Sequence, residues 1–339
     1  MRITPALLHK IAREAVARRS RQDRSLLAVF LGGSLVEGEP LMGGTTDIDL
    51  FFVHHEETRP EREIERLTDE VHLDIAHQAR DDYRQTRALR LHPWMGYNII
   101  NCIILFDPQH YLHFTQANVR AQFEQPEYIL GRARSQADQA RGIWLQLHDF
   151  KGEPGLPELQ RYLEAVGQAA NAIACLSGLP LTERRFLLRF PSRAEAIGHP
   201  GLYAGLLGLL GGPQVDGETL IDWLPAWEAA YLSLSSANAL PRLHPHRCAY
   251  FRRAFDSIVS SEAPQNILWP LLRTWTDVVE KLTENSEAHQ IWRESMEKLG
   301  LLGSDFRDKV VALDIYLDSV EEILDEWGQA SGIEEMRFT

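Results

Sequence analysis

The sequence predicts an α+β protein, in which a small mixed-sheet domain with helices precedes an all-α helical domain. Short apolar runs that end in turn residues, the pattern of buried strands, are confined to roughly the first 110 residues. Beyond that point, apolar residues recur at the helical period instead. A chain of 339 residues is long enough for two such domains, which we place at residues 1–115 and 116–339.

The first domain is expected to begin with a helix and to continue mainly as strands. Thr4 and Pro5 are a typical N-cap and first-turn pair, and apolar residues follow at helical spacing up to Val16. The segment RPEREIERLTDE, at residues 59–70, has the pattern of a further helix. The four expected strands lie at residues 26–33 (with a closing glycine turn), 47–53, 71–78 and 97–106.

The second domain is punctuated by prolines and carries amphipathic helices. Its last strong helix is expected at residues 308–327, where apolar residues from Val310 to Trp327 follow a spacing of 3-4-3-4-3. The other face of this helix holds an acidic stripe from Asp314 to Asp325, which we expect to be solvated. The other strong helical segments are residues 157–178, 216–238 and 246–261.

Composition narrows the classes of function. The three cysteines, Cys102, Cys175 and Cys248, are far apart and form no zinc motif, which fits a reducing compartment. No apolar run reaches the length of about 18 residues that a membrane span needs, so we expect a cytoplasmic protein without a membrane partner. The net charge of −13 disfavours general nucleic-acid binding and suits a cationic small substrate.

Two aspartates inside a buried strand are the main functional signal. Asp47 and Asp49 lie in the apolar run TDIDLFFV, and side chains two residues apart on a strand share one face. The apolar residues between and after them, Ile48, Leu50 and Phe52, therefore take the opposite face. Adjacent carboxylates repel each other, and a divalent cation such as Mg²⁺, which prefers oxygen ligands, removes that repulsion.

The neighbouring segments supply further polar groups of the right kind. Gly33 and Ser34 follow the first expected strand, where exposed backbone N–H groups at a glycine turn suit phosphate. Asp74 lies between apolar residues in the third expected strand and could complete a two-metal site. Asp81 and Asp82 are nearby alternatives for this third acid.

The motifs LGGS, TDIDLFFV and LDIA, in this order, resemble the nucleotidyltransferase superfamily with the DNA polymerase β-type palm. The motif region spans residues 32–76, and the wider resemblance covers about residues 1–110. The loop between Ser34 and Asp47 is towards the long end for the superfamily. A compact palm followed by a helical domain is similar to the aminoglycoside nucleotidyltransferases, although the helical part offers no motif of its own.

The resemblance implies a mechanism and a set of roles. Asp47 and Asp49 would bind Mg²⁺, and Asp74 would hold a second Mg²⁺ or act as base for the acceptor hydroxyl. Gly33 and Ser34 would contact the β- and γ-phosphates of an NTP, ATP being the first choice. The enzyme would then transfer AMP to a hydroxyl of a small-molecule acceptor and release pyrophosphate, with the helical domain on the acceptor side.

Several alternatives stay open at this point. The acceptor could be a protein or an RNA, as in toxin–antitoxin nucleotidyltransferases, or the chain could be a nucleotide-binding regulator without turnover. The sequence leaves open whether the protein is a monomer or a homodimer. We expect His72, which shares a strand face with Asp74, to be solvated or hydrogen-bonded. We expect Arg132, Arg134 and Arg141 to form a solvated helix face, although they could reach a triphosphate.

Overall fold

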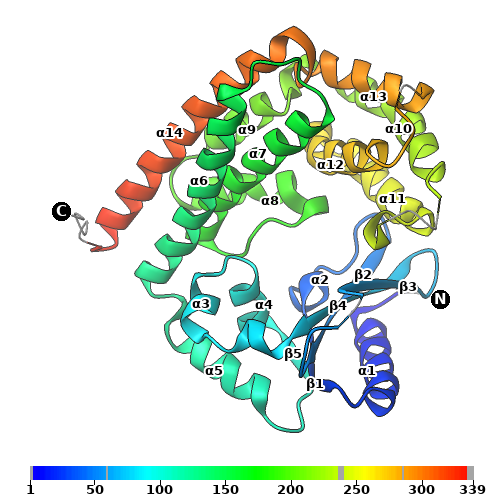
Figure 1. Cartoon of the computed structure of the whole chain (residues 1–339), viewed down its shortest axis with the longest axis vertical. Helices are drawn as coiled ribbons and strands as arrows, with labels where there is room; N and C mark the ends of the chain where they lie inside the picture. Colours follow the sequence, from blue (N-terminus) through cyan, green and yellow to red (C-terminus); the bar gives the residue numbers. More distant parts are fainter. Residues whose placement is uncertain (1–2, 59, 236–239, 285, 334–339) are drawn as a thin grey trace. The chain divides into compact units, whose positions relative to one another are not determined.

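The computed structural model describes residues 3–58, 60–235, 240–284 and 286–333, shown in Figure 1. The chain divides into two compact units, one made of residues 1–124 and 240–254 and the other of residues 125–239 and 255–339. The first unit holds a five-stranded mixed sheet, and the regular elements described in the second are all helical, so the α+β prediction is confirmed. The first unit extends past residue 115 and includes a segment that the sequence places in the helical domain.

The sheet of the first unit has the strand order β3-β4-β2-β1-β5. Strands β2 and β4 are parallel, and the other neighbours are antiparallel. The parallel pair at the centre aligns the two strands that carry the predicted acids. The strands are β1 (Leu26–Leu31), β2 (Thr46–His54), β3 (Arg62–Arg66), β4 (Val71–Ala79) and β5 (Ile103–Phe106).

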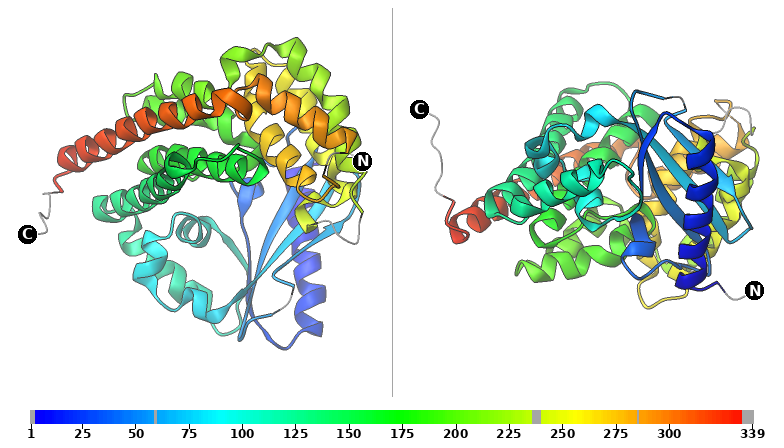
Figure 2. Two further views of the ribbon diagram at one scale, coloured as in Figure 1. Left: turned by 45° about the horizontal axis from the view of Figure 1, so that its top comes forward. Right: turned by 90° about the horizontal axis from the view of Figure 1, so that it is seen from below.

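Helix α1 (Pro5–Gln22) covers one face of this sheet, as both views in Figure 2 show. Thr4 caps the helix as predicted, because its hydroxyl accepts a hydrogen bond from the Leu7 backbone N–H at 3.3 Å. Leu8 and Ala12 of α1 belong to the same buried core as Ile48 and Leu50 of β2. The alternation expected for β2 is therefore confirmed: its apolar residues face α1, which leaves the aspartates on the other face.

Two of the expected elements in the first unit are wrong. The segment expected as a helix at residues 59–70, of which residue 59 lies outside the described residues, instead contains β3 at Arg62–Arg66, because β4 provides a partner strand and Arg19 of α1 pairs with Glu63 and Glu65. In the expected strand at residues 97–106, only β5 is extended. The first part is helix α4 (Met95–Asn101), which buries Tyr97, Ile99 and Ile100.

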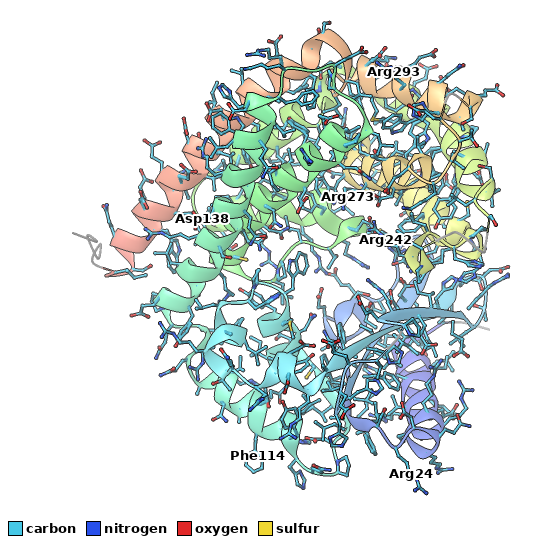
Figure 3. All side chains as sticks on the ribbon, viewed as in Figure 1. Arg24, Phe114, Asp138, Arg242, Arg273 and Arg293 are labelled. Carbon is cyan, nitrogen blue, oxygen red and sulfur yellow. The ribbon has the colours of Figure 1, made fainter. Side chains whose placement is uncertain are left out.

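The remaining helices of the first unit are short, apart from α5. The exposed side chain of Phe114 on α5 projects away from the unit (Figure 3), whereas Leu112, Val119 and Phe123 form its buried face. These helices are α2 (Gly33–Val36), η1 (Arg80–Tyr83), α3 (Thr86–Leu91), α4, α5 (Tyr111–Phe123), η4 (Pro241–Leu243), η5 (Pro245–Arg247) and the first turns of α11 (Cys248–Val259).

The expected helices at residues 157–178 and 308–327 are confirmed as α7 (Leu156–Ser177) and α14 (Phe306–Ala330), and that at 246–261 as α11, which begins in the first unit. The helix expected at 216–238 ends at Leu232, and residues 236–238 lie outside the described residues. The α-helices of the second unit are α6 (Pro126–Asp149), α7, α8 (Phe186–Ala196), α9 (Leu202–Leu209), α10 (Gly217–Leu232), the end of α11, α12 (Leu268–Val279), α13 (Glu287–Lys298) and α14. Short 3₁₀ helices lie between them: η2 (Glu183–Arg185), η3 (Gly212–Gln214), η6 (Pro264–Ile267) and η7 (Gly303–Asp305).

The acidic stripe of α14 is paired rather than only solvated. Arg141 of α6 donates to Asp314, to Asp318 at 2.6 Å and to Glu321 at 2.8 Å, and Arg134 donates to Asp325 at 2.9 Å. These contacts tie two long helices together. They also engage two of the arginines that the sequence left available for a triphosphate.

Across the described parts of the chain, no helix combines the length and apolar character that crossing a membrane would require.

Candidate active site

The parallel pairing of β2 with β4 places the three predicted carboxylates together. Asp49 lies opposite Asp74, and Asp47 lies opposite His72. Paired residues on neighbouring strands point to the same face, which here is the face away from α1. Burial, together with the nearby charges of Asp74 and Asp47, raises the pKa of the Asp49 carboxyl to about 8. The carboxylates therefore form one electrostatic cluster.

Two arginines neutralise part of this cluster. Arg62 of β3 binds Asp74 through both carboxylate oxygens, with N–O distances of 2.6 Å from Nε and Nη2. Arg247 donates from Nη2 to Asp47 Oδ2, and its Nη1 lies 3.7 Å from Asp74 Oδ2. Asp47 and Asp74 are buried, and buried carboxylates need such partners. The Arg247 guanidinium thus lies close to both Asp47 and Asp74.

Asp49 is the acid of the three that pairs with neither Arg62 nor Arg247. Its carboxylate makes neither a hydrogen bond nor an ion pair with any residue that the structure describes. The cluster pairs Asp74 with Arg62 and Asp47 with Arg247, whereas Asp49 has no such pair. At neutral pH it therefore either retains a proton on Asp49 or attracts a further cation.

Gly33 fits against this uncompensated acid. A Cβ atom at Gly33 would lie 1.9 Å from Asp49 Oδ2, and the residue has a φ of 67°, so both space and backbone conformation require glycine. The Gly32 N–H donates to the Asp49 carbonyl oxygen at 3.0 Å. Ser34 is half-buried, and its hydroxyl forms no hydrogen bond to a described residue. The predicted turn therefore lies directly beside Asp49.

The two alternative acids lie at the surface. Asp81 and Asp82 are exposed on η1, where Asp82 accepts from the Ala79 N–H, so neither replaces Asp74.

His72 was expected to be solvated or hydrogen-bonded. It is not solvated, since it is fully buried with Nδ1 3.7 Å from Asp47 Oδ1. Its ring stacks on His246 at 5.3 Å. Burial and nearby positive groups lower the pKa of His246 to about 4, so this ring is neutral at pH 7.

The segment 240–254 is the part of the site that sequence reasoning missed. It brings Arg247 to Asp47, which is 200 residues earlier in the chain. The loop before β2 binds this segment, because the Thr45 hydroxyl donates to the Tyr250 carbonyl oxygen at 3.2 Å. A Cβ at Gly43 would lie 2.1 Å from the Arg253 carbonyl oxygen, so glycine is required there as well. The available signal was the density of arginine and aromatic residues in HRCAYFRR.

The donor set is of the kind that a divalent cation uses. Carboxylate oxygens are the ligands that Mg²⁺ prefers, and Asp49 is uncompensated. Within the described residues, however, no group of three or more His, Cys, Asp or Glu side chains is arranged to hold a metal ion. Arg62 donates to both oxygens of Asp74, and Arg247 donates to Oδ2 of Asp47. The residues fit a cation at Asp49 once a neighbouring acid exchanges its arginine for the metal.

Comparison with known proteins finds similarity at the level of solved structures and none at the level of sequence. No family model and no curated protein matches the chain. The crystal structure of a nucleotidyltransferase-like protein from Exiguobacterium sibiricum 255-15 matches 92% of this chain and 91% of its own, at 12% sequence identity and a TM-score of 0.27. At this identity and TM-score, the match establishes neither a shared family nor shared chemistry.

Proposed function

We propose that the protein is a Mg²⁺-dependent nucleotidyltransferase that transfers AMP from ATP to a hydroxyl of a small-molecule acceptor. The observation that carries the proposal is the alignment of Asp49 with Asp74 on two parallel strands, with Asp47 on the same face. Three carboxylates on one face of the sheet, one of them paired with neither arginine, are costly for a structural core and useful for holding a cation. The order of the motifs LGGS, TDIDLFFV and LDIA supports the same reading.

In this proposal each residue has a defined role. Asp47 and Asp49 hold the first Mg²⁺, and Asp74 holds a second or accepts the proton of the acceptor hydroxyl. When bound, Mg²⁺ would neutralise charge on the phosphates and on the reacting oxygens. Gly33 contacts the β- and γ-phosphates through its backbone, and Ser34 contacts them through its hydroxyl. The acceptor oxygen forms a bond to the α-phosphorus, the bond from that phosphorus to the bridging oxygen breaks, and pyrophosphate leaves.

One observation favours a second candidate, a nucleotide-binding regulator without turnover. Arg62 donates to both oxygens of Asp74, and Arg247 donates to Oδ2 of Asp47. Arginine pairs of this kind stabilise the acids without any metal. In such a protein the cluster would be a permanent structural ion-pair network, and ATP would bind without being cleaved.

Labelled ATP distinguishes the two candidates. The wild-type protein is incubated with Mg²⁺, α- or γ-labelled ATP and a panel of acceptors: cationic polyhydroxyl compounds, proteins and RNA. Transfer of α-label to a small molecule, with γ-label released in pyrophosphate, is the expected result. Asp49→Asn should abolish transfer, whereas Asp81→Asn, at an exposed acid on η1, should not. Binding of ATP without transfer to any acceptor would favour the regulator, and absence of Mg²⁺-dependent ATP binding would refute both candidates.

A further inference from the structure

Arg247 is a buried cation in the middle of the acidic cluster. Only 3% of its surface is exposed. Its guanidinium contacts Asp47 and approaches Asp74, the other two acids of the proposed metal site besides Asp49. The carbon at the centre of the guanidinium lies 4.6 Å from the ring centre of Tyr250 and 5.6 Å from that of Phe251. The aromatic rings and the acids together fix the charge in one place.

The first unit holds Arg247 through several independent contacts. The Tyr250 carbonyl accepts from Thr45, which is two residues before Asp47. The backbone at Arg253 packs directly on Gly43. On the surface, Arg253 Nη1 pairs with Glu70 at 3.1 Å. The loop that precedes Asp47 therefore also positions the arginine that neutralises it.

A fixed guanidinium has opposite consequences for free and nucleotide-bound metal. A free divalent cation entering between Asp47, Asp49 and Asp74 has to displace Arg247 or tolerate its charge at close range, in a site shielded from water. A divalent cation that arrives on a nucleoside triphosphate brings a net negative charge. For that complex, Arg247 and Arg62 are attractive neighbours and can pair with phosphate oxygens.

We propose that Arg247 is a resident counter-ion that makes the carboxylate site select a metal–nucleotide complex over the free metal. The inference depends on the proposed function, because it assumes that the acids bind metal with a nucleoside triphosphate. It adds to that function a specificity-determining residue and an order of binding: the metal enters with its nucleotide rather than ahead of it. Removing the charge at position 247 therefore tightens the binding of free metal and weakens its dependence on nucleotide.

Mn²⁺ binding measured by electron paramagnetic resonance tests this directly, without any turnover. The wild-type protein, Arg247→Gln and Arg247→Met are titrated with Mn²⁺ alone and with Mn²⁺ plus α,β-methylene-ATP, whose α–β linkage resists transfer. Both variants remove the charge but differ in polarity, so either one that keeps a native circular-dichroism melt is sufficient. Arg253→Met is the matched control, because it removes an arginine of the same segment 240–254 that pairs with Glu70 instead.

The proposal expects Arg247→Gln or Arg247→Met to bind free Mn²⁺ about tenfold more tightly than wild type or better, with Arg253→Met unchanged. The factor by which the analogue tightens Mn²⁺ binding should fall in the same variants. If the analogue promotes Mn²⁺ binding in wild type but free Mn²⁺ binds these variants no more tightly, the inference is wrong and the proposed function stands. If no form binds Mn²⁺ with or without the analogue, both are wrong.

Discussion

Gly33→Ala is the substitution for which the structure gives the sharpest expectation. Residue 33 has a φ of 67°, and a methyl group there would lie 1.9 Å from Asp49 Oδ2. The left-handed backbone costs about 1–2 kcal/mol for a residue with a Cβ. Displacing the Asp49 side chain from the space beside residue 33 costs about 1–3 kcal/mol more. We therefore expect the free energy of unfolding to fall by about 2–5 kcal/mol.

The chain offers a control that separates the two contributions. Gly44 has a φ of 77°, but a Cβ there would meet no heavy atom within 4 Å. Gly44→Ala should therefore carry the backbone cost alone, about 1–2 kcal/mol. Urea denaturation followed by circular dichroism measures both variants. Because the methyl group at residue 33 displaces the Asp49 carboxylate, only Gly33→Ala should also lose Mn²⁺–nucleotide binding.

The result that would refute this reasoning is equality of the two variants. If Gly33→Ala and Gly44→Ala lose the same stability and bind Mn²⁺ with α,β-methylene-ATP equally well, then Gly33 does not pack on Asp49 in solution. The predicted place of the turn beside the acid cluster would then be incorrect.

Two further predictions concern charges in the cluster. In metal-free protein, burial and the neighbouring acids raise the pKa of Asp49 from its ordinary value of about 3.8 to about 8 in the folded state. Its contribution to stability is therefore fully present below about pH 4 and is lost as pH rises through about 8. Asp49→Asn should flatten the decline of the unfolding free energy between these values, and an unchanged pH profile from urea titrations would contradict the raised pKa. Arg62→Met should lower the free energy of unfolding by about 1–3 kcal/mol, because it leaves the buried Asp74 without the arginine that binds both of its oxygens. The loss is moderate because half of the Arg62 side chain is exposed to solvent. Arg84→Met, which removes only an exposed pair with Asp81 at 3.4 Å, should cost under about 0.5 kcal/mol in the same assay.

The sequence by itself determined the class of fold and the face on which the acids lie. Alternation along a strand is a local property, so TDIDLFFV is sufficient to put Asp47 and Asp49 opposite Ile48 and Leu50. The helical period likewise predicts α7 and α14 without knowledge of their partners. The glycine turn at Gly33 was also readable, since it follows directly from a buried strand.

Only the tertiary structure decided which charges meet. Local pattern assigned residues 59–70 to a helix, but pairing with β4 made Arg62–Arg66 a strand and brought Arg62 to Asp74. No local signal connects Arg247 to Asp47, because the two residues are 200 positions apart and meet only when the segment 240–254 folds into the first unit. Strand alternation is fixed by the geometry of each backbone segment, whereas neutralising a buried charge depends on which distant segment the fold brings within reach.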